Sequence, residues 1–307
     1  MIPWQKKGEW LELRLPQLLD SEEGIKEYIR LPDKYWNQLV KSGGISIKGP
    51  RVRLRLFPNE PIKNMHRWAP VEVLYEDDFC LVVQKPAGMK VHGDNTAKTE
   101  QVPTLSDAVA SYYEATGQQC KVRHIHRLDE DTTGPVLYAK HEWSHLILDE
   151  AMREKQIGRQ YVAIVQGRLK EKAGTIDAAI GRDRHHPARR RVSPTGERAV
   201  THYEVDKQWT EAALVKLRLE TGRTHQIRVH MNYLGHPIWG DELYGGKKHN
   251  MDRQALHGER LELHHPLTGE ELLIECPWPE DMKNLLQHTA KNIVMLFPRK
   301  PYKSIDK

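Results

Sequence analysis

The residues best suited to chemistry include a carboxylate in segment 126–140, which reads HRLDEDTTGPVLYAK. Asp129 follows Arg127 and precedes a Thr-Thr-Gly turn that opens an expected strand. A loop between two strands can hold such a carboxylate at the floor of a cleft. The alternative is that Asp129 or Asp131 only caps the turn, and spacing alone favours this cap.

A second group of polar side chains occupies segment 221–245, TGRTHQIRVHMNYLGHPIWGDELYG. Clustered donors at the start of a helix suit an anionic ligand. A polar, solvent-facing helix surface explains the same pattern equally well. The donors in question are Arg223, His225, Gln226, Arg228 and His230.

Three further segments are ambiguous when each is taken alone. VVQKPAGMKVH at 82–92 is typical of a strand that runs into a turn, and GRQYVAIVQG at 158–167 places Tyr161 at the head of a buried strand. The run RDRHHPARRR at 182–191 is expected to be a loop. It is either simply solvated or in contact with phosphates, because the guanidinium fork suits phosphate oxygens.

The elements that must position these residues can be predicted from hydrophobic periodicity. Helices are expected at 104–117, 142–156 and 224–235, the last with Thr224 as a possible N-cap and Gly235 as its end. Strands are expected at 79–86, 134–140, 161–167, 197–205 and 213–220, with two more within 261–276. Strands outnumber helices and several neighbours resemble hairpins. We therefore expect an α+β domain on a mostly antiparallel mixed sheet with flanking helices.

Residues 1–68 have a different pattern and are expected to form a small N-terminal α/β module. A short helix, a Gly43-Gly44 turn, a strand that ends at Gly49-Pro50 and a second strand, VRLRLF, follow one another there.

Bulk properties limit the classes of protein to which the chain can belong. It has 307 residues, 38% of them hydrophobic, and a formal net charge of +5. No segment approaches the roughly 18 apolar residues that a membrane span needs, and the N-terminus lacks the apolar stretch of a signal peptide. The three cysteines are odd in number and far apart, which argues against a disulfide framework. A cytoplasmic protein is expected.

Together, the motifs resemble those of the RluA-type family of pseudouridine synthases, in the order that this family shows. They stand here as KPAGMKVH, HRLDEDTTG, RQYVA and GRTHQIRVHMNYLGHPIWGDELYG, and the segment at 253–281 is similar too. The resemblance covers about residues 71–281. It implies the pseudouridine synthase fold with a central RNA-binding cleft, a catalytic domain over 69–290 and a C-terminal tail over 291–307.

The resemblance also implies an activity. The enzyme would isomerise specific uridines in structured RNA, ribosomal or transfer RNA, by flipping the base out and by breaking and re-forming the glycosidic bond. Asp129 matches the family's catalytic carboxylate, Arg228 its cationic partner and Tyr161 its active-site tyrosine. No cofactor or metal is implied, and a monomer is expected.

RNA contacts are expected from several further residues. Arg127 resembles the family's residue that fills the space left by the flipped base. Arg223, His225 and Gln226 are candidates for positioning the RNA or supporting the site, and the basic loop with Arg189, Arg190 and Arg191 for contacting phosphates. Residues 1–68 resemble a degenerate S4-type module whose usual basic helix is weak, so RNA binding there is an open question.

Two departures from the family pattern are Thr133, where Ser is frequent, and Pro135, which lacks a ladder donor and puts the local strand pairing in doubt. Three other functions have less support. A non-catalytic RNA-binding or ribosome-assembly factor on the same fold would have lost Asp129, Tyr161 or Arg228. A metal hydrolase is suggested only by 17 histidines, without metal-ligand spacing. A glycosidase would need carboxylates farther apart than sequence neighbours.

Overall fold

The computed structural model describes residues 3–15, 21–60, 62, 67–93, 102–248 and 250–296, without the side chains of 290–296. The chain divides into two compact units. The first contains Met1–Glu130, Pro135–Gly158 and Leu261–Glu275; the second contains Asp131–Gly134, Arg159–Arg260 and Cys276–Lys307.

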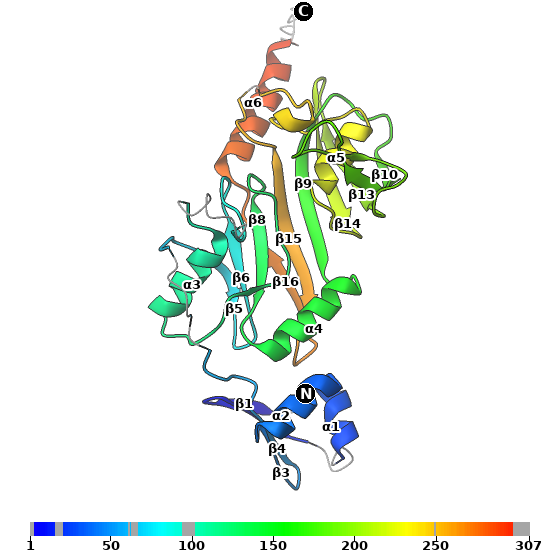
Figure 1. Ribbon diagram of the computed structural model, residues 1–307. Coiled ribbons are helices and arrows are strands. Elements are labelled where there is room, and N and C mark those ends of the chain that lie inside the picture. The colour runs from blue at the N-terminus through cyan, green and yellow to red at the C-terminus, as the bar shows by residue number, and fades with distance from the viewer. Residues whose placement is uncertain are drawn as a thin grey trace, which may run out of the picture. The chain divides into compact units, whose positions relative to one another are not determined.

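The first unit begins with a four-stranded antiparallel sheet, whose strands β1, β2, β4 and β3 are neighbours in that order (Figure 1). Apolar residues of β2 and β4 share one core with the helices α1 (Glu22–Tyr28) and α2 (Asp33–Lys41). This core includes Leu11, Leu54, Ile25 and Trp36. The bounds are β1 Trp4–Lys7, β2 Trp10–Arg14, α1 Glu22–Tyr28, α2 Asp33–Lys41, β3 Ile45–Lys48 and β4 Arg51–Leu54.

This N-terminal module packs on the rest of the first unit. Its core extends to Phe79, Trp143 and Ile147, and the indole of Trp143 donates a hydrogen bond to the carbonyl of Ile29 at 3.1 Å. Helix α2 and strands β3 and β4 confirm the expected helix, turn and strands. The pattern did not predict β1, β2 or α1, and the domain boundary after residue 68 stays a prediction.

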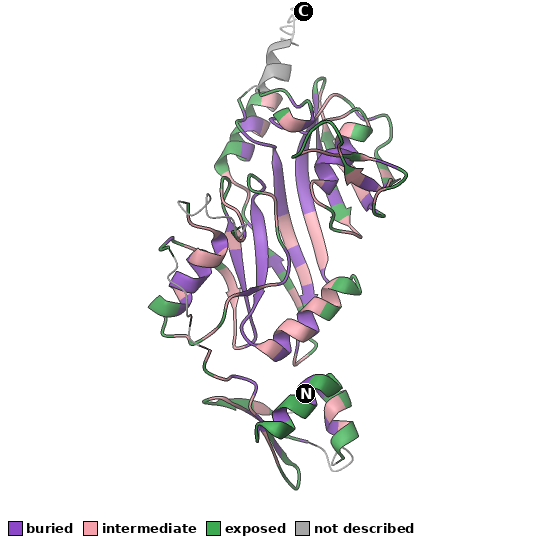
Figure 2. Cartoon of the chain, viewed as in Figure 1, coloured by how far each residue is buried: buried purple, intermediate pink, exposed green. Residues whose placement is uncertain are grey.

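A second four-stranded sheet of this unit has the order β5-β6-β8-β7. Alternate residues of β6 face opposite ways: Leu81 and Val83 pack in the cluster of helix α3, and Cys80 and Val82 in the cluster that contains Leu148 of α4. Figure 2 shows the resulting burial along β6 and β8. The bounds are β5 Glu72–Glu76, β6 Cys80–Lys85, α3 Leu105–Ala115, β7 Arg123–His124, β8 Gly134–Ala139 and α4 Glu142–Arg153, and strand β16 (Glu271–Glu275) neighbours β15.

The second unit is built on strands in the order β10-β13-β14-β9-β15. The pairs β10–β13, β13–β14 and β14–β9 are antiparallel. On β14, buried Val215 and Leu217 alternate with exposed Lys216 and Arg218, as expected of a half-buried strand. The bounds are β9 Gly158–Gln166, β10 Ala173–Asp177, β11 Ile180–Arg182, β12 Arg190–Val192, β13 Val200–Gln208, β14 Ala212–Leu219, α5 Gln226–Tyr233, η2 Glu242–Tyr244, β15 Leu256–His264 and α6 Glu280–Leu296.

The remaining expected elements are confirmed, with three adjustments. Residues 183–189 form the expected loop, and the flanking strands β11 and β12, which pair as a β-hairpin, were not predicted. The N-cap of α5 is His225 and not Thr224, although Gly235 follows its end with a φ of 81° as expected. Helix α6 continues past residue 290, and the rest of the expected tail, 297–307, lies outside the described residues.

Candidate active site

Asp129 lies in the first unit, in the irregular segment between β7 and β8, with its side chain half-buried. The carbonyl of the next residue, Glu130, accepts hydrogen bonds from Nζ of Lys85 at 2.5 Å and from the backbone N–H of Met89 at 3.3 Å. The loop that carries Asp129 is therefore attached to the turn that follows β6. Arg127 is exposed in the same loop.

Lys85 is a fully buried cation that holds this arrangement together. Besides Glu130, its ammonium group donates to the carbonyls of Pro86 at 2.7 Å and Met89 at 2.6 Å. An ammonium group has three protons, and three carbonyls are within reach of it. The Lys-Pro-Ala-Gly-Met motif thus supports the Asp129 loop, a role that sequence reasoning did not assign.

The Thr-Thr-Gly part of the motif belongs to the second unit, where it lies against β15. The carbonyl of Thr133 accepts from the backbone N–H of Gly258 at 2.8 Å, and the Thr133 hydroxyl lies 2.8 Å from Nδ1 of His257. Gly134 has a φ of 140°, and a Cβ there would be 2.7 Å from the Cα of Gly258. Only glycine fits this close approach. Pro135, at the start of β8, lies outside the registered β7–β8 pairs, which involve residues 138 and 139.

Arg228 is buried in the second unit and forms a bidentate ion pair with Asp241. Its Nε donates to one carboxylate oxygen of Asp241 at 2.7 Å and its second guanidinium nitrogen to the other at 2.8 Å. Asp241 is 2% exposed, so both charges are removed from water. The guanidinium also lies 5.0 Å from the ring centre of Tyr244. Asp241 and Tyr244 stand in the segment GDELYG, but sequence reasoning gave them no role.

Tyr244 links Arg228 to three other predicted site residues. Its hydroxyl accepts a hydrogen bond from the backbone N–H of Arg190 at 2.9 Å and lies 2.8 Å from Nδ1 of His225. The guanidinium of Arg189 lies 5.7 Å from its ring centre. His225 has a φ of 59°, a left-handed conformation that is uncommon outside glycine. The basic hairpin and the start of α5 therefore meet at one buried tyrosine.

Gln226 supports the start of α5 from inside. Its amide nitrogen donates to the carbonyl of Val200 and to the hydroxyl of Thr201, both at 3.0 Å. Its amide oxygen accepts from the Thr221 hydroxyl at 2.7 Å and from the backbone N–H of Arg223 at 3.0 Å. The side chain is 3% exposed and holds the start of α5 in place, and its role toward RNA stays a prediction.

Arg223 and Tyr161 complete the predicted set in the second unit. Arg223 is exposed, forms an ion pair with Glu197 and donates from Nε to the carbonyl of Arg198 at 3.1 Å. Tyr161 is 6% exposed on β9, opposite Leu217 of β14. Asp129 belongs to the first unit, and its expected proximity to Tyr161 and Arg228 stays a prediction.

The histidine of α5, His230, is fully buried. Burial lowers the pKa of His230. The Ala178 carbonyl, 2.9 Å from its Nε2, and the charge of Asp177 raise the pKa but offset only part of this effect. Its Nδ1 lies 2.8 Å from the Thr201 hydroxyl. His230 therefore anchors the helix to β13, and its burial keeps it out of contact with phosphates.

Within the described ranges, no group of three or more histidine, cysteine, aspartate or glutamate side chains is placed to hold a metal ion. In the same part of the chain, no helix combines the length and the apolar character needed to cross a bilayer.

The fold and motifs define a class of protein, and comparison with known proteins agrees with it. Residues 79–233 match the family model described as RNA pseudouridylate synthase. The chain belongs to the RNA pseudouridine synthase family, and within it to the RluA type. Its activity is the isomerisation of uridine in RNA to pseudouridine.

Two bacterial relatives are similar over almost the whole chain. An uncharacterized RNA pseudouridine synthase, YhcT of Bacillus subtilis, is 43% identical over 93% of this chain and 95% of its own. The ribosomal large subunit pseudouridine synthase D of Vibrio parahaemolyticus is 38% identical over 91% of this chain and 93% of its own. Among solved structures, human RNA pseudouridylate synthase domain containing 4 matches with a TM-score of 0.59 and 26% identity, over 71% of this chain and 93% of its own.

Proposed function

We propose that Asp129 is the carboxylate that acts on the sugar of a flipped uridine, with Arg228 as its cationic partner and Tyr161 beside the base. The observation that carries this proposal is the attachment of the Asp129 loop to buried Lys85 through the carbonyl of Glu130. A side chain on a loop held in this way keeps one position relative to a substrate, which is what oriented catalysis requires.

The proposed chemistry follows from the bonds that change. The N1–C1′ bond breaks, the uracil rotates, and C5 joins C1′. Positive charge develops at C1′, and the carboxylate of Asp129 stabilises it or attacks that carbon. The base must first leave its stack, at a cost of a few kcal/mol, and Arg127 on the same loop is proposed to fill the vacated space.

Arg228 is suited to its proposed role because it is already held in place. The bidentate pair with Asp241 uses Nε and one terminal nitrogen of the guanidinium. A guanidinium carries five N–H donors, and the pair with Asp241 uses two of them. The basic hairpin with Arg189, Arg190 and Arg191, together with Arg223 and His225, is proposed to contact RNA, since Arg suits phosphate oxygens.

The substrate is proposed to be ribosomal RNA, with transfer RNA as the alternative. Relatives named ribosomal large subunit pseudouridine synthase D, at 34–40% identity, favour ribosomal RNA. The enzyme is proposed to act as a monomer in the cytoplasm, and we expect full activity after exhaustive chelation.

One experiment tests both the catalytic residue and the substrate. Pseudouridines are mapped in total RNA from a strain that lacks the gene, then after complementation with the wild type, Asp129→Asn or the matched control Asp131→Asn. We expect one or more positions to disappear, and to return with the wild type and the control only. For purified Asp129→Asn, tritium release from C5-labelled uridine in RNA should fall by at least about a hundredfold. Restoration by Asp129→Asn would refute the assignment of Asp129.

A further inference from the structure

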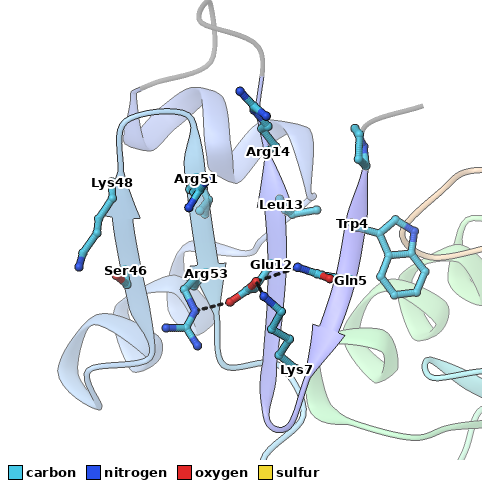
Figure 3. Close-up of a pocket in the computed structure, with 12 residues that line it drawn as sticks. Trp4, Gln5, Lys7, Glu12, Leu13, Arg14, Ser46, Lys48, Arg51 and Arg53 are labelled. Carbon is cyan, nitrogen blue, oxygen red and sulfur yellow. Dashed lines mark hydrogen bonds and ion pairs between the residues drawn. The ribbon is translucent and has the colours of Figure 1, made fainter.

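The N-terminal sheet has one face that its helices do not cover. On the opposite face, Leu11 and Leu54 pack against α1 and α2. The uncovered face, here called the outer sheet face, is hollowed into a groove of about 600 Å³ (Figure 3). It carries five cations and one carboxylate: Lys7, Glu12, Arg14, Lys48, Arg51 and Arg53.

Three of these cations form a row across neighbouring strands. Arg14 of β2 is directly opposite Arg51 of β4, and Arg51 is directly opposite Lys48 of β3. Neighbouring strands are about 4.8 Å apart, so the three side chains stand close together on one face. Among the described residues, none of the three has an ion-pair partner.

This row is unfavourable for the stability of the isolated module. Like charges directly opposite each other on a sheet are destabilising. The neighbouring cations differ, because the Glu12 carboxylate accepts from Lys7 at 2.6 Å and from Arg53 at 2.9 Å. The positive charge that remains uncompensated is therefore concentrated on Arg14, Arg51 and Lys48.

The helices on the other side of the module do not share this charge. Helix α1 carries Glu22, Glu23 and Glu27 with Lys26, and α2 carries Asp33 with Lys34 and Lys41. Acidic residues thus slightly outnumber basic ones on the helices. The excess of cations in this module therefore lies on the sheet and not on the helices.

The apolar side chains at the outer sheet face are largely packed against the protein itself, with Leu13 4% and Val52 1% exposed, and so are poor anchors for a protein partner. Of its two nearby tryptophans, Trp10 is covered by the guanidinium of Arg53, 5.0 Å from the ring. Trp4 packs edge-on against Phe79, with ring centres 5.2 Å apart. What the face offers a partner is therefore charge and hydrogen-bond donors, which suits phosphates better than a folded protein surface.

We propose that the outer sheet face binds the phosphate backbone of the substrate RNA, with Arg14, Arg51 and Lys48 as its main contacts. The site lies outside the segment that matches the family model, residues 79–233. It goes beyond uridine isomerisation: it is a second RNA-binding surface that contributes affinity without touching the reacting nucleotide. Phosphates would neutralise the cation row and release condensed counterions.

The test compares two variants of the full chain with the same change in charge. The test variant is Arg14→Gln/Lys48→Gln/Arg51→Gln. The control, Arg30→Gln/Lys34→Gln/Lys41→Gln, removes three exposed cations on the helical side of the module: Arg30 between the helices, and Lys34 and Lys41 of α2. Binding of a labelled RNA stem-loop is measured by fluorescence anisotropy over a range of salt. The test variant should weaken binding at least about tenfold and lower the slope of log K against log salt by about 2, while the control stays near wild type.

Catalytic measurements separate this proposal from the assignment of Asp129. At saturating RNA, tritium release by the test variant should keep the wild-type kcat, with a raised KM. Wild-type affinity and salt slope in the test variant would overturn the proposal, as would an equal loss in the control variant.

A second variant guards against misfolding. Arg51→Glu places a carboxylate between Arg14 and Lys48, so its melting temperature should equal or exceed that of the wild type while RNA binding falls. Undiminished RNA affinity in this folded variant would refute the proposal. So would equally tight binding of polyglutamate at the same salt concentration, which would indicate an acidic protein partner instead.

Discussion

Burying the guanidinium of Arg228 would be costly without a partner, because a charge removed from water requires pairing and hydrogen bonds. Asp241 supplies both, through two short hydrogen bonds in a place that is almost inaccessible to solvent. The ring of Tyr244 also lies against the guanidinium, with its centre 5.0 Å away. This support determines where the donors of Arg228 point, and therefore what they can do for a substrate or a catalytic carboxylate.

Removal of this support gives a prediction about single residues. Asp241→Ala leaves a buried, uncompensated guanidinium, so the free energy of unfolding should fall by about 3–5 kcal/mol. Tritium release should fall as well, because Arg228 loses its orientation. The neighbouring Glu242→Ala is the control. The Glu242 side chain is 66% exposed and comes no nearer than 4.0 Å to the ammonium group of Lys248, so the free energy of unfolding should change by less than about 0.5 kcal/mol. Equal unfolding midpoints in urea for both variants would contradict this account.

The motifs identify single residues only where chemistry has a recognisable pattern. Asp129, Tyr161 and Arg228 could be named from the sequence because each stands in a motif of the family. The role of Lys85 could not, because its acceptors are backbone carbonyls, one of them 45 positions away. The same holds for Asp241, whose partner is 13 positions away on a different element. A carboxylate–guanidinium pair has no periodicity that a single sequence reveals.

At the scale of elements, one buried side chain joins the end of β6 to the loop before β8. Lys85 is the last residue of β6, and its ammonium group bonds to carbonyls at 86, 89 and 130. Strands β6 and β8 are neighbours in one sheet. Beyond the end of β6, the ammonium group and the Met89 to Glu130 backbone bond attach the turn to the loop.

Lys85→Met tests the importance of this connection. Methionine keeps much of the apolar stem but leaves three carbonyls without their donor, at about 1–3 kcal/mol for each unsatisfied buried group. The melting temperature should fall, and tritium release should fall about tenfold or more at a temperature where the variant is still folded, because a small displacement of a catalytic group is costly. The exposed Lys121→Met should change neither quantity. Normal activity in folded Lys85→Met would show that the loop keeps its position without the ammonium group.

The predicted elements were most accurate where local signals agree. Helix α3 begins at a capping box between Thr104 and Asp107 and carries an apolar stripe, so its position could be predicted closely. Strands β11 and β12 were missed because they place arginine opposite arginine, Arg182 and Arg190, beside the loop 183–189. Packing explains the difference: Ile180, Ala199, Val229 and Tyr244 share one core cluster that includes β11 and α5.

At the scale of the molecule, a modest net charge of +5 conceals two concentrated basic surfaces. One is the outer sheet face in the first unit, and the other is the hairpin with Arg189, Arg190 and Arg191 in the second. Composition cannot predict this distribution, because the sheet-face cations come from four strands and become neighbours only through strand register. The division into two units was equally hidden, since both units contain separate stretches of the chain.

If one RNA molecule binds to both basic surfaces, their contributions to the salt dependence of binding must add. Arg189→Gln/Arg190→Gln/Arg191→Gln should weaken RNA binding and lower the slope of log K against log salt by about 2, at about 0.7 for each phosphate that the protein no longer neutralises. The backbone bond from Arg190 to Tyr244 does not depend on the side chain and should persist. Combining these substitutions with the outer-face triple should lower the slope by about 4, with additive losses of binding free energy. A combined variant that binds like the hairpin triple alone would mean that the sheet face does not touch RNA in this complex.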